Sequence, residues 1–168
     1  ALWIHTFVPG LPMSNLDHGL VNANSLTGVG TIDEALDALQ PRRQPGEMSL
    51  FDEILTDQLE SSKTLLVDLA NASEANKAEV EEGSRLLAQA REAAGTARQI
   101  FDAAVAARIG AIDLGAIFDR DSLNRLISRP EVGETAQHLQ PAHMPYLFPE
   151  VFQRKRGGFD VPVSYTHL

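Results

Sequence analysis

The chain has 168 residues, which is enough for one domain, and 43% of them are apolar. Its 23 acidic and 14 basic residues give a formal net charge of −9, so the chain as a whole repels phosphate and is expected to bind DNA weakly by itself. The absence of cysteine excludes disulfides, thiolate metal sites and thiol nucleophiles. No apolar run approaches the roughly 18–20 residues of a membrane helix, and the first ten residues do not resemble a signal peptide. We therefore expect a cytoplasmic protein with no membrane partner.

The first 40 residues predict short strands, turns and one helix. Residues 2–8, which are aromatic and β-branched, are typical of a strand, and residues 16–30 predict a second strand that runs into Gly28 and Gly30. Thr31 and Glu34 form a capping-box pattern that predicts a helix over residues 32–39. This alternation of strand, loop and helix is typical of an α/β protein.

The middle of the chain predicts a linker followed by a helical hairpin. Residues 40–47 contain two prolines and no apolar side chain, which indicates a linker, and the next helix should start after Ser49. Apolar side chains at three- and four-residue spacings predict a helix up to a break around Ser73, and residues 77–110 predict a second, alanine-rich helix antiparallel to it. Shorter helices should follow over residues 110–130, closed by a turn at residues 128–135.

The last region again has α/β character. Its prolines at 141, 145 and 149 exclude a long helix, and the five residues Tyr146, Leu147, Phe148, Val151 and Phe152 form an apolar surface that must be buried. A basic loop with two glycines then leads into a predicted strand that starts at Phe159. The sequence thus predicts a helical insertion between two segments of one sheet.

Motifs for common chemistries are weak or missing. His138 and His143, with Glu150 as a third ligand, could suggest a metal site, but without cysteine and with prolines between them a surface or hydrogen-bonded histidine is favoured. The sequence has no nucleophile elbow and no Walker A loop, and Gly28–Gly30 lack the rest of a dinucleotide fingerprint. A second weak pattern, for acid/base chemistry, consists of His5, Asp17 and His18.

Two stretches resemble a known family. "LPMSNLDHGLVNANSLTGVGT" is similar to "LPLSFLDHxLxxGNSLxG" of large restriction–modification methylases of the N6-adenine class, including fused restriction enzyme–methyltransferases. "MPYLFPEVFQRKRGGFDV" is similar to their later "WxxEFPEVFxxxGGFDVVIGNPP[YWF]". The order is the same and the helical insertion is of comparable size. The resemblance covers roughly residues 1–36 and 143–161.

The resemblance implies a parent α/β protein with a Rossmann-like sheet that binds S-adenosylmethionine and methylates adenine N6 in double-stranded DNA. It assigns the cofactor adenine to the segment of Asn24, Ser25 and Leu26, where Ala23 replaces the family's usual glycine. The segment near the active site would be Gly157, Gly158, Phe159 and Asp160. The candidate phosphate contacts, with a solvated loop as the simpler interpretation, are Arg154, Lys155 and Arg156.

The sequence departs from this family after Val161. Residues 162–168, "PVSYTHL", replace the expected Ile-Gly-Asn-Pro-Pro-aromatic. The tetrapeptide Asn-Pro-Pro-aromatic occurs nowhere in the 168 residues, so we expect no catalytic residue in this chain and an inactive fragment. The expected divisions are a partial core at 1–40, linker and insertion at 41–130, the approach to the catalytic strand at 131–161 and a foreign, adapter-like tail at 162–168. Mg²⁺ would be needed only if a nuclease is fused elsewhere.

An alternative belongs to another class of protein. In it, residues 48–110 form a non-enzymatic coiled-coil hairpin that binds a protein partner. This alternative requires a continuous stripe of exposed Leu and Ile side chains after the hairpin has closed.

Overall fold

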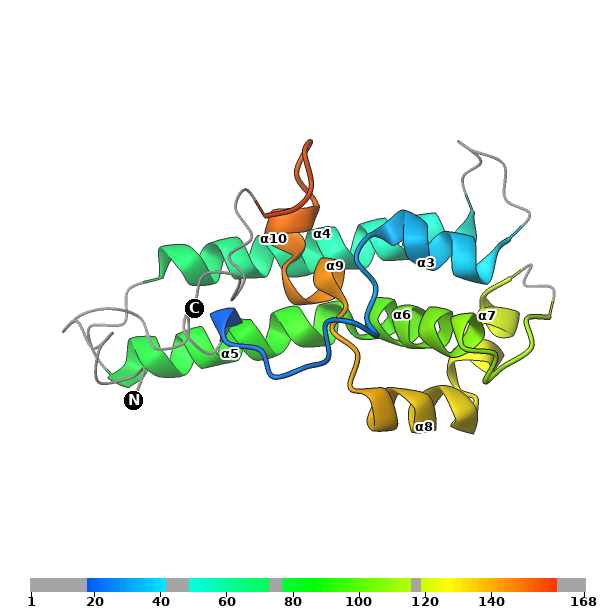
Figure 1. Ribbon diagram of the computed structural model, residues 1–168. Helices are drawn as coiled ribbons and strands as arrows, with labels where there is room; N and C mark the ends of the chain where they lie inside the picture. Colours follow the sequence, from blue (N-terminus) through cyan, green and yellow to red (C-terminus); the bar gives the residue numbers. More distant parts are fainter. Residues whose placement is uncertain (1–17, 42–48, 73–76, 116–118, 160–168) are drawn as a thin grey trace, which may run out of the picture.

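A computed structural model describes residues 18–41, 49–72, 77–115 and 119–159, and this part of the chain is mostly α-helical (Figure 1). The predicted helical character is therefore confirmed. The described residues contain no strand, only one isolated bridge, so the strand expected over residues 16–30 is not formed where it is described. The strand expected at residues 2–8 lies outside the described residues, and of the strand expected from Phe159 onward only Phe159, which is irregular, is described. The helices are α3 (Ile32–Leu39), α4 (Leu50–Asn71), α5 (Lys77–Ala93), α6 (Gly95–Arg108), α7 (Arg120–Ile127), α8 (Pro130–Leu139), α9 (Met144–Leu147) and α10 (Pro149–Phe152).

The long helices form the predicted antiparallel hairpin, α4 against α5 (Figure 1). α4 starts at the predicted capping box, in which the Ser49 backbone N–H donates to Asp52 Oδ2 at 2.8 Å and Ser49 Oγ accepts from the Asp52 N–H at 3.4 Å. The predicted second helix is split at Ala94 into α5 and α6. Gln58 of α4 explains the split, because its Oε1 accepts the N–H of Ala97 at 2.8 Å, and a side chain that enters the helical ladder interrupts it.

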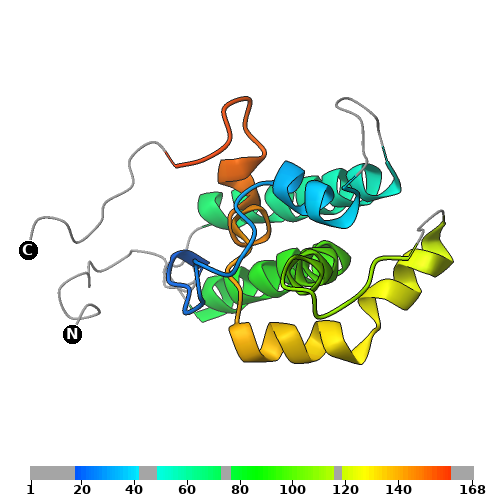
Figure 2. The same ribbon diagram turned by 45° about the vertical axis from the view of Figure 1, so that its right-hand side comes forward.

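The helix α6 forms the centre of the core. Ile100, Phe101 and the alanines around them are buried, and α3, α4 and α8 all pack against α6 (Figures 1 and 2). A helix that is buried around its circumference must be apolar on most of its faces, and alanine allows the neighbouring helices to approach closely. The alanine-rich sequence thus marks the central helix. A second, smaller cluster closes the far end of the hairpin and contains Leu66, Leu69, Leu87 and Ala90.

The segment 128–135 was expected to be a closing turn, and this expectation was wrong. Arg129 is the N-cap of α8, and Pro130 occupies its first turn, where the missing N–H of proline has no cost. The helix α8 continues to Leu139 and ends at Gln140, whose φ of 45° is left-handed. A proline that was interpreted as a breaker therefore starts a helix.

The prolines of the last region limit it to two single-turn helices. Pro145 and Pro149 lie in the first turns of α9 and α10 and are both buried. The expected apolar surface is only half-buried, and α10 packs against α4. The C-terminal segment is thereby attached to the helical hairpin.

Candidate functional site

The first stretch with the family resemblance meets the start of the second one and the three residues that precede it. The Asn24 N–H donates to Gln140 O at 2.7 Å, the Ala142 N–H donates to Asn24 O at 3.0 Å, and the Met144 N–H donates to Val29 O at 2.9 Å. Asn24 and Pro141 form a parallel bridge. We call residues 24–29 and 140–144, joined in this way, the junction. Within the described residues, the shared sheet expected from the sequence is reduced to this single bridge.

Gly28 allows the close approach at the junction. A Cβ atom built at Gly28 would lie 1.8 Å from the carbonyl oxygen of Ala142 and 2.3 Å from its carbonyl carbon. Since Cβ atoms essentially never lie within 3.0 Å of such atoms, any other residue would push the two segments apart. This glycine is therefore required for packing of one backbone on another.

Two side chains of α6, Asp102 and Arg108, bind the segments of the junction. Asp102 Oδ1 pairs with His143 Nε2 at 2.9 Å, which ties α6 to the C-terminal segment. Arg108, less than two turns further along, donates to Thr27 O at 2.7 Å and Gly28 O at 3.1 Å and also pairs with Glu34. The insertion and the two resembling stretches are thus parts of one core.

The Asp102–His143 pair is buried. His143 is 2% exposed, its ring lies 5.5 Å from that of Phe101, and its Nδ1 has no partner among the described residues. Arg98 Nε lies 3.9 Å from Asp102 Oδ2, and the Arg98 guanidinium carbon is 5.9 Å from the centre of the Tyr146 ring. The pair therefore joins α6 to the C-terminal segment inside the core.

The histidines considered for a metal site lie in different surroundings. His138 is exposed on α8, whereas His143 is bonded to Asp102. Glu150, the third candidate ligand, instead pairs with His18 at 2.9 Å, and the His18 ring lies 5.6 Å from that of Phe148. In the part of the chain that is described, no three potential metal ligands come together. His5 and Asp17 lie outside the described residues.

The predicted cofactor segment is an exposed turn. Asn24 Oδ1 accepts the N–H of Leu26 at 3.0 Å, so the side chain caps its own turn. Ser25 is exposed, and Leu26 is 92% exposed. A single exposed leucine is ordinary on a protein surface, so its exposure alone does not indicate a bound ligand.

The predicted segment near the active site is a second exposed loop. Arg154, Lys155 and Arg156 are exposed, and the loop projects from α10 in both views (Figures 1 and 2). Phe159 closes the loop, with its ring 5.4 Å from Phe148 and 5.7 Å from Phe152 in edge-on contacts. Two glycines permit this closure: a Cβ at Gly157 would lie 2.7 Å from Phe152 O, and Gly158 has a φ of 122°.

The structure does not bring the two predicted sites together. The loop of residues 153–159 projects from the top of the molecule in both views, whereas the chain that leads into α3 starts well below it (Figures 1 and 2). Asp160, the last of the predicted residues, lies outside the described residues. The junction and the contacts of His18 with Glu150 and Phe148 connect the two stretches.

A groove of about 1080 Å³ runs beside the junction, between α5–α6, α8 and residues 20–23. Asp102 and His143 form part of its lining, together with Arg91, Arg98 and Glu92. Leu20 and Val21 on its rim are 63% and 41% exposed. Its charged side chains have both signs, so the groove has no clear preference for an anion or a cation.

Sequence reasoning did not find the two α6 residues that hold the junction. Most charges on an amphipathic helix point to water, so neither Asp102 nor Arg108 was singled out. The apolar run around Asp102 on α6 could have indicated a partner for this residue, whereas Arg108 lies at the exposed end of the helix. A lone carboxylate inside an apolar stretch is expected to have a partner.

The chain matches no protein family model, no curated protein and no solved structure. Among the described residues, no helix is both long enough and apolar enough to cross a membrane.

Proposed function

We propose that this chain belongs to an S-adenosylmethionine-dependent DNA adenine N6-methyltransferase of a restriction–modification or related phage-defence system, acting in the cytoplasm. The proposal rests on the two stretches quoted above and on their order. The 168 residues contain no Asn-Pro-Pro-aromatic tetrapeptide, so the residues that hold the target adenine would be supplied by further polypeptide. This chain by itself is therefore not expected to transfer a methyl group.

One structural observation supports the proposal. The resembling stretches are more than 100 residues apart in the sequence, yet the Met144 N–H and the Val29 carbonyl oxygen are 2.9 Å apart, and His18 Nε2 lies 2.9 Å from Glu150 Oε1. Segments that belong to one core in a parent enzyme lie side by side in this way. An accidental likeness of two unconnected segments would give no reason for their contact.

In this proposal the Asn24 turn contacts the adenine of S-adenosylmethionine, with Ser25 and Leu26 as its neighbours. Loop residues Arg154, Lys155 and Arg156 approach DNA phosphate, a sequence-independent contact. Outside this loop the chain carries a large excess of acidic residues. This excess fits a parent enzyme in which another domain makes most of the contacts to DNA. Mg²⁺ is required only if a nuclease is fused to the same polypeptide.

The test is a measurement of N6-methyladenine in the DNA of cells that express the natural gene containing this sequence. The natural gene should introduce the modification, and Asn24→Ala should reduce it and raise the KM for S-adenosylmethionine about tenfold, the value of one lost hydrogen bond to a ligand. Asn24→Asp keeps the acceptor for Leu26 and should retain most of the activity. Asn22→Ala, an exposed neighbour, is the matched control. DNA without the modification in every case would contradict the proposal.

The alternative, a hairpin that binds a protein partner, lacks the surface that it needs in the described residues. Over residues 48–110, where they are described, the exposed large apolar side chains are Val67 at 43% and Ile109 at 55%, which lie at distant positions. Apolar residues exposed singly are ordinary on a protein surface. No stripe of the required kind supports this alternative.

A further inference from the structure

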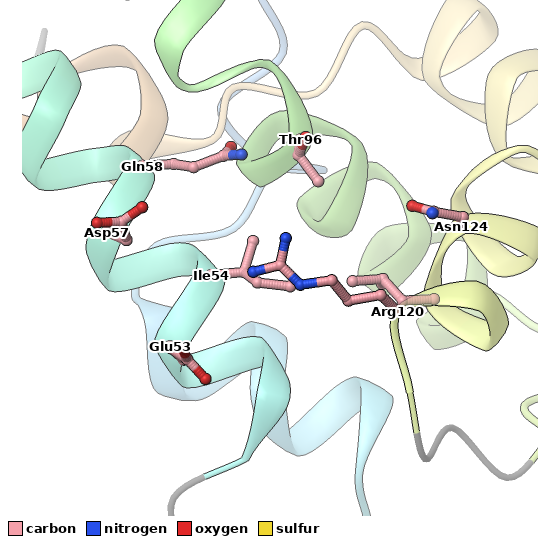
Figure 3. Close-up of a pocket in the computed structure, with 8 residues that line it drawn as sticks. Glu53, Ile54, Asp57, Gln58, Thr96, Arg120 and Asn124 are labelled. Carbon is pink, nitrogen blue, oxygen red and sulfur yellow. The ribbon is translucent and has the colours of Figure 1, made fainter.

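We propose that the helical insertion contains a binding site for a small zwitterion with an apolar body, of the class of free branched-chain α-amino acids. The site is a pocket of about 360 Å³ between α4, α6 and α7 (Figure 3). This volume lies at the lower end of the range of ligand pockets, about 300–1,000 Å³. The inference does not depend on the proposed methyltransferase function, because no residue of the pocket belongs to the resembling stretches.

The floor of the pocket is apolar. Ile54 of α4 and Leu123 of α7 line it and are 8% and 1% exposed. Both belong to the main core, so the floor is fixed by packing. A short aliphatic side chain of a ligand would lose contact with water on this floor, at a gain of roughly 25 cal/mol for each Å² buried.

The walls carry charged side chains of both signs. Glu53 and Asp57 lie one turn apart on α4, and Arg120 reaches from α7 across the pocket toward α4 (Figure 3). Among the described residues, none of these three side chains has a hydrogen bond or ion pair. Two carboxylates at this spacing repel each other by a few tenths of a kcal/mol unless a cation lies between them. An ammonium group is the complement of this pair, and a carboxylate is the complement of Arg120.

Polar neighbours restrict the size of the ligand. Thr96 and Asn124 lie on the rim, while the amide of Gln58 is held by its bond to the Ala97 N–H. The ammonium and carboxylate of an α-amino acid are attached to one carbon, so both can reach the walls only if the side chain points to the floor. A nucleotide or a nucleic acid is disfavoured, because two carboxylates face one arginine.

The experiment is an NMR titration of the full 168-residue chain with three probes: L-leucine, N-acetyl-L-leucine, which lacks the ammonium charge, and L-leucinamide, which lacks the carboxylate. L-leucine should give saturable shifts at the pocket residues, with a dissociation constant at least about fivefold lower than that of either analogue, the effect of about 1 kcal/mol for each charge. Absence of saturable shifts with L-leucine would overturn the inference. Equal affinity for all three probes would overturn it as well.

Variants assign each charge to its partner. Arg120→Gln should weaken L-leucine about fivefold and leave L-leucinamide unchanged, and Asp57→Asn should weaken L-leucine and leave N-acetyl-L-leucine unchanged. Asp68→Asn on α4 and Arg125→Gln on α7 are matched controls, since both residues are exposed and neither lines the pocket. If the controls weaken L-leucine as much as the pocket variants do, the binding is nonspecific and the assignment is wrong.

Discussion

Replacement of Gly28 by alanine should separate the two segments of the junction. The new Cβ would lie 1.8 Å from Ala142 O, so the backbones must move apart by at least about 1 Å before the contact is tolerable. The three backbone hydrogen bonds that join residues 24–29 to residues 140–144 cannot survive such a shift. At about 1 kcal/mol each, with a gain of about 0.5 kcal/mol from the stiffer unfolded chain, the net loss of stability is about 2–3 kcal/mol.

Urea denaturation followed by circular dichroism measures this loss directly, and thermal unfolding should show a Tm lowered by about 4–12 °C for a chain of this size. Gly133→Ala on α8 is the matched control, because nothing lies within 4 Å of a Cβ placed on Gly133 and alanine favours the helix. Gly133→Ala should therefore stabilise the protein slightly. If Gly28→Ala unfolds at the same urea concentration as the unchanged protein, the close packing of Gly28 on Ala142 is not formed in solution.

Three further predictions concern side chains that hold elements together. Asp102→Ala leaves the buried His143 without its partner and should lower the free energy of unfolding, measured in urea, by about 2–4 kcal/mol. Asp102→Leu combined with His143→Leu should restore much of this stability. A double variant as unstable as the single one would refute the pairing. Arg108→Gln loses the bonds to two carbonyl groups, so hydrogen exchange at residues 24–29 should become faster, and unchanged exchange would show that Arg108 does not hold the junction. The Ser122 hydrogen bonds lower the pKa of Asp119, the N-cap of α7. The contribution of ionised Asp119 to folding stability is therefore complete above the usual Asp pKa and is lost as the pH falls through the lowered pKa. The NMR shift of the Ser122 amide should titrate in that acidic window, but not in Asp119→Asn.

The elements predicted best were those with strong local patterns. Ser49 and Asp52 specify the start of α4 through bonds between neighbours in the sequence, and Thr31 caps α3 in the same local way, accepting the Glu34 N–H at 3.2 Å. Glu34 departs from the predicted capping box, because its Oε2 accepts the Gly30 N–H at 2.7 Å. Local chemistry of this kind can be read from a sequence, and the antiparallel hairpin followed from helix lengths and the break between them.

The elements predicted poorly depend on contacts between distant residues. The split at Ala94 needs Gln58, which lies more than 35 residues earlier, and α8 was missed because a proline that starts a helix has the same sequence pattern as one that ends it. Formation of a sheet also depends on strands that pair across the sequence, and in the described residues only the bridge at Asn24 is present.

The candidate site could be predicted in part. The resemblance selected the two stretches that the structure joins, but the partners that join them, Asp102 and Arg108, lie in the insertion, where the sequence does not show which distant segment a charged side chain will meet. The sequence assigned Asn24 to a cofactor contact, and its bond to the Leu26 N–H shows that the side chain also caps its own turn. The cap uses one lone pair of the amide oxygen, and the second lone pair remains for the proposed contact with the adenine amino group.

The most direct test of the central claim is the sequence of the source gene beyond the codon for Val161. We expect the natural gene to continue as an Ile- and Val-rich strand into Gly-Asn-Pro-Pro followed by an aromatic residue, which would supply the acceptors for the target adenine. A natural gene that continues without this tetrapeptide would contradict the assignment to the adenine methyltransferases.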